Sequence, residues 1–131
     1  MRYLGIDYGS RRVGIAVASE EGGIAFPKVV LQNNAGLISE VQKICIEEGI
    51  GGIVVGESKN FEQKENLIME QVHLFKEKLA DLSGLQVYLE PEFMSSQQAE
   101  FIQGKNEMLD ASAAAIILQS FMDRKKFKEA K

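Results

Sequence analysis

Hydrophobic and polar residues follow a strand-like pattern along the first quarter of the chain. Tyr3–Tyr8 and Val13–Ser19 are apolar runs joined by the turn sequence GSRR, which predicts a β-hairpin. Residues 23–31 (GIAFPKVVL) predict a third strand. Because Pro27 cannot donate a ladder hydrogen bond, we expect this strand at a sheet edge or at a bulge. These residues together predict an antiparallel meander.

The next part of the chain alternates between helical and strand patterns. Apolar residues recur at helical spacing over residues 37–45 and 67–82, and Gly49 and Gly84 follow these stretches as stop signals. Residues 49–56 are short, β-branched and continuously apolar, which is typical of a strand covered on both faces. Residues 85–90 (LQVYLE) predict a fifth strand.

Two helical patterns complete the chain. Ser95 and Gln98 form a capping-box pattern that opens a short helix, and residues 108–123 predict a final helix rich in small and apolar residues. The element order is therefore β-β-β-α-β-α-β-α-α. A meander followed by parallel crossovers predicts an α/β fold: a five-stranded mixed sheet flanked by helices.

Composition narrows the class of protein. The 131 residues suggest one domain over 1–131, and 45% apolar with 26% charged residues is typical of a globular protein. No apolar stretch approaches the ~20 residues of a membrane span, and the N-terminus has no signal-peptide pattern. Cys45 is the only cysteine, so we expect no internal disulfide and a cytoplasmic location. The oligomeric state is not indicated.

Charge is unevenly distributed. The net charge of −4 argues against a protein coated with nucleic acid, because phosphate binding needs clustered Lys and Arg. Basic residues nevertheless gather in the Arg11–Arg12 turn and in the tail over residues 123–131. We interpret the tail as a solvated helix end.

Three acids lie at the ends of predicted elements. Asp7 ends the first strand, Glu92 lies just past the fifth strand, and Asp110 opens the last helix. With the first strand central, these carboxylates could converge at one sheet edge. Three adjacent acids repel unless a cation lies between them, and oxygen ligands suit Mg²⁺ or Mn²⁺. Two such ions, ~3.5–4 Å apart, support phosphodiester cleavage.

Each residue also has a purely structural interpretation. Asp7 fits a turn acid, Asp110 fits a helix N-cap or first-turn acid, and Glu92 fits an exposed loop acid. His73 fits a surface residue of the second helix, and Cys45 fits a small core residue. The position of any one of these residues does not distinguish a structural role from a catalytic one.

Four stretches of the sequence resemble one known family. They are LGIDYGSRRVGIAVAS (4–19), GGIVVGESKN (51–60), PEFMSSQQAE (91–100) and LDASAAAIILQSFMD (109–123). They follow the motifs of the YqgF/RuvX family of RNase H-like proteins, described as Holliday-junction resolvases and as nucleases that mature the 5′ end of pre-16S rRNA. The first and last stretches are the most specific, and the resemblance covers nearly the whole chain.

The resemblance implies an RNase H-like fold and a metal-dependent nuclease acting on structured RNA or branched DNA. It implies that Asp7, Glu92 and Asp110 are the catalytic, metal-binding acids, the same three reached above from their positions. It also implies a set of substrate-binding residues. These are Arg11, Arg12, Lys59, Asn60, Ser95 and Ser96.

The chain departs from the family in its substrate loops. Pro91 stands where the family usually has Asp, Phe93 where it usually has Arg, and Glu57–Ser58 where it usually has Leu-Pro. Losing an Arg removes a bidentate phosphate donor. An alternative is therefore a catalytically weak module that binds nucleic acid or protein. Actin-like and sugar-kinase-like ATPases also open with an acid and glycines in a hairpin, but they need two such domains.

Overall fold

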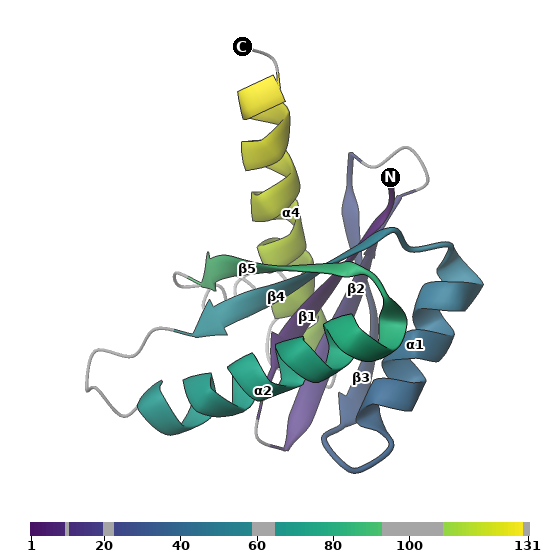
Figure 1. Ribbon diagram of the computed structural model, residues 1–131. Coiled ribbons are helices and arrows are strands. Elements are labelled where there is room, and N and C mark those ends of the chain that lie inside the picture. Colours follow the sequence, from purple (N-terminus) through teal and green to yellow (C-terminus); the bar gives the residue numbers. More distant parts are fainter. Residues whose placement is uncertain (10, 20–22, 59–64, 93–108, 130–131) are drawn as a thin grey trace.

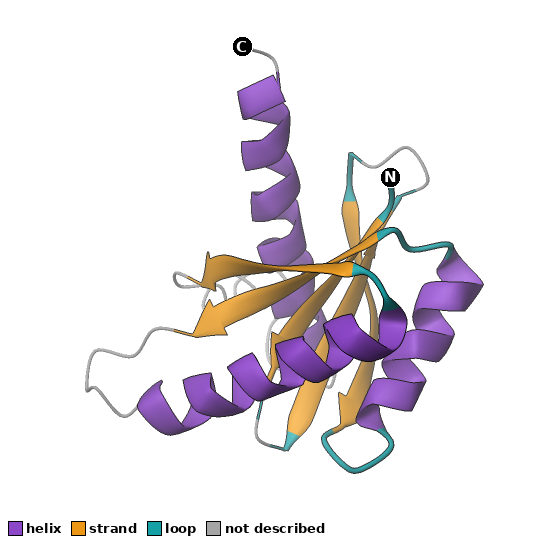
Figure 2. Ribbon diagram, in the orientation of Figure 1, coloured by secondary structure: helices purple, strands orange, loops and turns teal. Residues whose placement is uncertain are grey.

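A computed structural model describes residues 1–9, 11–19, 23–58, 65–92 and 109–129 of the chain. A central sheet has α1 and α2 on one face and α4 on the other (Figures 1 and 2). The elements, in chain order, are β1 (Tyr3–Tyr8), β2 (Arg12–Ala18), β3 (Ala25–Gln32), α1 (Leu37–Glu48), β4 (Gly52–Ser58), α2 (Glu65–Ser83), β5 (Gln86–Glu92) and α4 (Leu109–Glu129). The short helix predicted at Ser95 lies outside the described residues.

The sheet has the predicted mixed topology. Its strand order is β3-β2-β1-β4-β5, with β1 in the centre. The β1–β2 and β2–β3 pairs are antiparallel, whereas β1–β4 and β4–β5 are parallel. The parallel pairs follow from the crossovers through α1 and α2, and they place the C-terminal ends of β1, β4 and β5 at one edge of the sheet.

Pro27 lies at a position where its missing N–H is tolerated. It is in the edge strand β3, and the β2–β3 register shifts between Ile15 and Ala16, where Ala16 pairs with Pro27. The prediction of an edge or bulge position is confirmed on both counts. Pro91 is tolerated for the same reason, because β5 is the opposite edge strand.

The ends of β5 and α4 lie further along the chain than the sequence pattern predicts. β5 continues to Glu92, because its pairing with β4 extends through Glu57–Pro91 and Ser58–Glu92. Glu92 is therefore the last residue of the strand and not part of the following loop. α4 continues from Asp123 to Glu129, because residues 124–129 (RKKFKE) are mostly good helix formers although the apolar pattern has ended.

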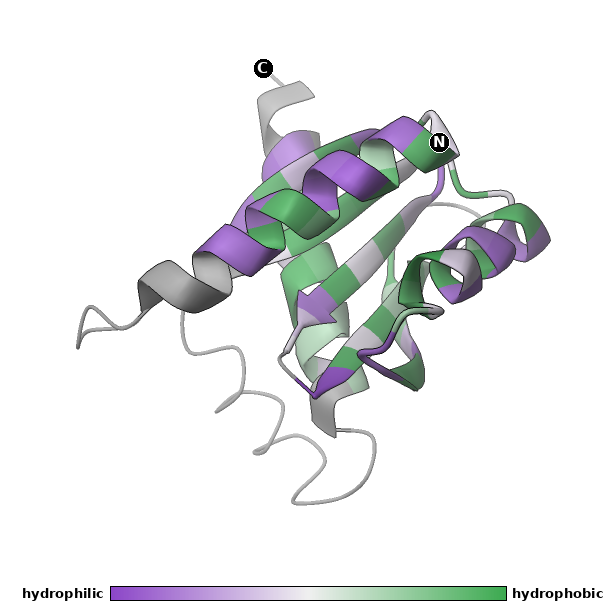
Figure 3. Cartoon of the chain, turned by 60° about the horizontal axis from the view of Figure 1, so that its bottom comes forward, coloured by the Kyte–Doolittle hydropathy of each residue, from purple (hydrophilic) through white to green (hydrophobic). Residues whose placement is uncertain are grey.

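One face of the sheet is built from large aliphatic side chains. Leu4, Ile6, Val13 and Ile15 are fully buried there, against α1 and α2. Green, hydrophobic residues recur along the strands, and hydrophobic and hydrophilic bands alternate along both helices, as expected for amphipathic helices (Figure 3). Gly49 and Gly84, at positive φ (64° and 72°), follow α1 and α2 where the sequence predicts the stops.

The other face is built from small side chains. Ala16, Ala18, Ala114 and Ala115 pack there around Tyr3, and α4 approaches the sheet closely. A Cβ placed on Gly5 would lie 2.7 Å from Leu118 Cβ and 2.8 Å from the Ala114 carbonyl oxygen. Only glycine fits at this crossing of β1 and α4. In the described part of the chain, no helix is both long and apolar enough to cross a bilayer.

Candidate active site at the C-terminal edge of the sheet

Asp7 occupies the central strand at the edge where the parallel strands end. It is the penultimate residue of β1, it is half-buried, and it pairs with Gly14 of β2. Tyr3, Gly5 and Asp7 alternate with Leu4 and Ile6, which face α1 and α2. Asp7 therefore lies on the α4 face of the sheet.

Glu92 ends β5 at the same edge. The register pairs Ile6 with Val55 and Val55 with Leu89, so β1 and β5 run parallel with only β4 between them. The backbones of Asp7 and Glu92 thus lie at the C-terminal ends of two strands separated by one strand. The structure does not describe the Glu92 side chain.

The direction of α4 brings Asp110 to this edge as well. Phe121 contacts Tyr3, with ring centroids 5.3 Å apart, while Ala114 and Leu118 approach Gly5. Moving toward the N-terminus of α4 therefore means moving toward the C-terminus of β1. The first turn of α4, which contains Asp110, begins beside the strand end that carries Asp7. The structure describes the backbone of Asp110 but not its side chain.

Both edges of the sheet hold α4 in this orientation. The Gln119 side chain accepts a hydrogen bond from the Ala25 N–H (2.9 Å) and donates one to the Gly23 carbonyl (3.0 Å), which ties α4 to β3. On the opposite edge, Ser120 and Arg124 both donate to Glu90 of β5; the Ser120 Oγ to Glu90 Oε2 distance is 3.0 Å. Polar contacts to both edges oppose rotation of the helix.

The role of Glu90 was missed from the sequence. Only 3% of its surface is exposed, and the carboxylate is satisfied by Ser120 and by an ion pair with Arg124. The alternation of Val87 and Leu89 with Glu90 is a sequence signal that places Glu90 on the α4 face. No sequence pattern indicates its partners, which lie 30 and 34 residues away.

The arginine pair lies beside the same edge. Arg11 and Arg12 are both exposed, and Arg12 is the first residue of β2. The turn is bound to the start of the β3–α1 connection: the Asn33 N–H donates to the Arg11 carbonyl (2.9 Å) and Asn33 Nδ2 donates to the Gly9 carbonyl (2.7 Å). These bonds fix the backbone that carries the two guanidinium groups.

Several predicted site residues fall outside the part of the chain that the structure describes. They are Lys59, Asn60, Ser95, Ser96 and, among the departures from the family pattern, Phe93. Among the described side chains, no group of at least three His, Cys, Asp or Glu residues is placed to hold a metal ion. That observation does not cover the Asp7–Glu92–Asp110 set, because two of its side chains lie outside the description.

The structural interpretations of the remaining residues agree with the fold. Cys45 is buried in α1 within the aliphatic core, and its burial raises the pKa of the thiol to about 11. His73 is exposed on α2, and Arg124 and Lys125 are exposed on α4. The positions of Cys45 and His73 match the predicted core cysteine and surface histidine, whereas Arg124, predicted as part of a solvated helix end, is ion-paired with the buried Glu90.

Sequence comparison identifies relatives along almost the whole chain. A family model described as "RuvX: Holliday junction resolvase" matches residues 1–124. A protein of Oleidesulfovibrio alaskensis, named "Putative pre-16S rRNA nuclease", is 37% identical over 94% of this chain and 92% of its own length. A protein of the same name from Nitratidesulfovibrio vulgaris is 35% identical over 94% of each chain.

Structural comparison confirms the predicted RNase H-like fold. Thermus thermophilus RuvC, solved in complex with a Holliday junction substrate, superposes with a TM-score of 0.65 at 21% identity over 96% of each chain. The fowlpox virus resolvase, also solved with junction DNA, gives a TM-score of 0.58 at 11% identity, covering 95% of this chain and 99% of its own. The family match confirms the predicted nuclease class in place of the ATPase alternative. With 124 of its residues matched by the family model, the chain belongs to the RuvX Holliday junction resolvase family.

Proposed function

We propose that this chain is a metal-dependent nuclease in which Asp7, Glu92 and Asp110 are the catalytic carboxylates. The observation that supports the proposal most directly is the convergence of three backbones. β1 and β5 end at one sheet edge, and α4 begins beside the end of β1 because of the direction in which it crosses Gly5. Acids 85 and 18 residues apart in sequence are thereby brought to one end of the fold.

The chemistry of this donor set fits a hard divalent cation. Three carboxylates without His or Cys favour Mg²⁺ or Mn²⁺, and we propose two ions, held by Asp7, Glu92 and Asp110. When bound, such ions activate a water molecule and stabilise the leaving oxygen of a phosphodiester. The chain supplies the rigid support: Asp7 is in the central strand, and α4 is fixed to both sheet edges through Gln119 and Glu90.

The exposed arginine pair fits a role in substrate positioning. Arg11 and Arg12 lie at the turn between β1 and β2. We therefore expect a strand of nucleic acid bound at Asp7 to pass over them. Contacts of this kind orient the backbone without reading its sequence. We propose that Lys59, Asn60, Ser95 and Ser96 add further phosphate contacts, as the family resemblance implies.

The proposed substrate is structured nucleic acid. The names of the relatives refer to pre-16S rRNA and to Holliday junctions, and both present a phosphodiester in a folded or branched context. We propose structured RNA, with the 5′ end of pre-16S rRNA as the first candidate, or branched DNA. We expect the activity in the cytoplasm.

A cleavage panel tests the proposal. Wild-type protein is incubated with structured RNA, junction DNA, duplexes and single strands, each with Mg²⁺, Mn²⁺ or EDTA. We expect cleavage of at least one structured substrate with metal and none with EDTA. Asp7→Asn should abolish cleavage, whereas Glu47→Gln, a change at an exposed acid of α1, should leave it intact.

A binding measurement separates the nuclease from a catalytically weak module. Mn²⁺ should raise the thermal midpoint of wild type and of Glu47→Gln but not of Asp7→Asn, because a ligand of the native state stabilises it by mass action. A wild-type midpoint indifferent to Mn²⁺, together with nucleic-acid binding but no cleavage, would instead favour the binding module.

A further inference from the structure

A pocket lies on the face of the sheet opposite Asp7 but at the same end of β1. It has a volume of about 450 Å³ and is bounded by α2, the end of β1 and the β3–α1 connection. This size is within the ~300–1,000 Å³ range of small-ligand sites. Tyr8 lines it and is the residue after Asp7, so the pocket and the candidate active site flank one strand end.

The lining combines aromatic rings with side-chain amides. The half-buried Tyr8 ring packs on the buried Phe75 ring, with centroids 4.9 Å apart. Asn33 and Gln71 contribute amide groups, and Leu74, 60% exposed, adds an apolar wall. A flat ring stacks on aromatic groups, and amides donate and accept hydrogen bonds at its edge. This combination fits a nucleobase.

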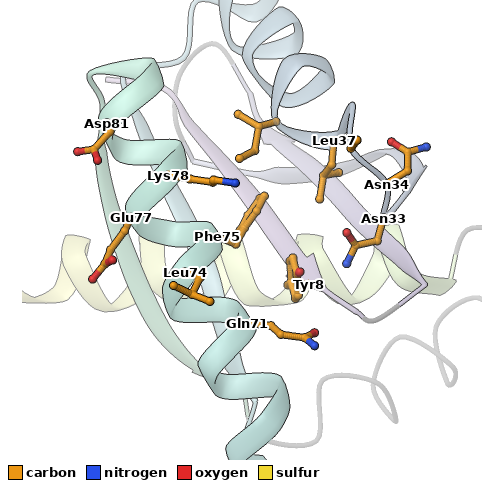
Figure 4. Close-up of a pocket in the computed structure, with 12 residues that line it drawn as sticks. Tyr8, Asn33, Asn34, Leu37, Gln71, Leu74, Phe75, Glu77, Lys78 and Asp81 are labelled. Atoms are coloured by element: carbon orange, nitrogen blue, oxygen red, sulfur yellow. The ribbon is translucent and has the colours of Figure 1, made fainter.

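The two ends of the pocket differ in charge. Tyr8, Asn33 and Gln71 gather at one end, and Asp81 lies at the other (Figure 4). The amide end is bonded to the arginine turn, because Asn33 binds the carbonyls of Gly9 and Arg11. Phosphate is therefore favoured at the Tyr8 end, next to the arginine turn, whereas at the other end Lys78 partly offsets the negative charges of Glu77 and Asp81.

We propose that this pocket binds one unpaired nucleobase of the substrate strand, with the adjoining phosphates on the Arg11–Arg12 turn. The inference rests on the proposed function and extends it, because it assigns a site for a single-stranded segment next to the cleaved region. A strand that leaves the Asp7 side crosses the arginine turn and enters the pocket at Tyr8. The enzyme then prefers substrates in which paired and unpaired regions meet.

The test measures binding in EDTA, where cleavage does not interfere. The probes are a blunt hairpin, the same hairpin with a short single-stranded overhang, and the overhang with one base replaced by an abasic site, each made as RNA and as DNA. We expect the overhang to tighten binding by roughly tenfold and one abasic site to remove that gain. The RNA and DNA arms show which strand the pocket accepts. A 2-aminopurine at the sensitive position should lose fluorescence on binding as it stacks.

The variant Gln71→Ala/Leu74→Ala removes two exposed wall residues and should abolish the abasic penalty without lowering the thermal midpoint. His73→Ala is the matched control, since it lies on the same exposed helix segment outside the pocket. If the abasic site weakens binding equally in variant and wild type, the base binds elsewhere. If blunt and overhang hairpins bind with equal affinity, the pocket proposal is wrong while the proposed function stands. Failure to bind any hairpin would overturn the proposed function with it.

Discussion

The two faces of the sheet are packed by opposite means. On one face, large aliphatic residues such as Ile6 and Ile15 fill the space beneath α1 and α2. On the other, Gly5 and a row of alanines leave so little space that α4 lies almost against the strand backbones. The first arrangement stabilises through buried apolar area, whereas the second fixes the position of one helix.

This difference matters because only one face carries the acids. Asp7 and Glu90 lie on the α4 face, and the first turn of α4 contains Asp110. A close-packed, polar-tethered helix suits the placement of a catalytic group within a narrow tolerance. A damaged aliphatic face should therefore cost mainly stability, while a damaged α4 face should cost activity at the same time.

The largest expected effect is on the aliphatic face. Leu79→Ala removes a fully buried side chain of α2 and should lower the free energy of unfolding by about 3 kcal/mol, through lost transfer energy and a cavity. Leu82→Ala, at a 62% exposed position of the same helix, is the control and should change it by less than about 0.5 kcal/mol. Urea denaturation measures both. Cleavage by folded Leu79→Ala should stay near wild type at low temperature.

A smaller loss of stability with a larger loss of activity is expected on the α4 face. Gly5→Ala places a methyl group against a backbone oxygen and a Cβ of α4, so the helix must shift, at a cost of about 2 kcal/mol. Gly23→Ala is the control, because a Cβ there meets nothing within 4 Å. At a temperature where Gly5→Ala and Leu79→Ala are both folded, Gly5→Ala should cleave the substrate more slowly than Leu79→Ala. The reverse order would remove the proposed division between the faces.

The tether between α4 and β5 should contribute less. Arg124→Met leaves the buried Glu90 carboxylate with Ser120 as its remaining donor and should cost about 1–2 kcal/mol, because Arg124 is half exposed. The double change Glu90→Met/Arg124→Met removes both charges and should cost less than the single change. A double-mutant cycle from urea denaturation checks this, and strictly additive losses would show that the pair does not interact.

The ion pairs of Glu48 with Arg2 and Lys28 should make a contribution to stability that depends on pH. The hydrogen bond from Lys28, with Arg2 nearby, lowers the pKa of Glu48. A lowered folded-state pKa means that this stabilisation is present above the ordinary Glu pKa and is lost as the pH falls through the folded value. Glu48→Gln should therefore lower the free energy of unfolding at pH 7 by at most about 1 kcal/mol, seen as a slightly lower thermal midpoint, and should not lower it in acid. Glu47→Gln, a change at an exposed acid of the same helix, is the control.

The smallest effect concerns chemistry within the aliphatic core. Because burial raises the pKa of Cys45 to about 11, the thiol should be protonated and unreactive at pH 8. An aromatic disulfide reagent should modify it slowly in the native protein and rapidly in urea. Fast modification of the native state would mean that the core beneath α1 opens readily.

Local sequence patterns were sufficient to predict the elements and most of their buried faces. β1 has the predicted bounds of Tyr3–Tyr8, α1 ends at the predicted Gly49 stop, and Pro27 is at an edge, because periodicity and backbone chemistry are local properties. The end of α4 was placed too early, since helix propensity outlasts the apolar pattern. The candidate acids were found because each stands at the end of an element.

Which of these ends meet depends on how the helices pack on the sheet. The direction of α4 across Gly5 brings the start of α4 to Asp7, and no local pattern encodes that crossing. The partners of Glu90 and the pocket beside Tyr8 likewise join segments far apart in the chain. The chemistry of a side chain is a property of one residue and can be read from the sequence. The distance between two side chains depends on the packing of the whole chain.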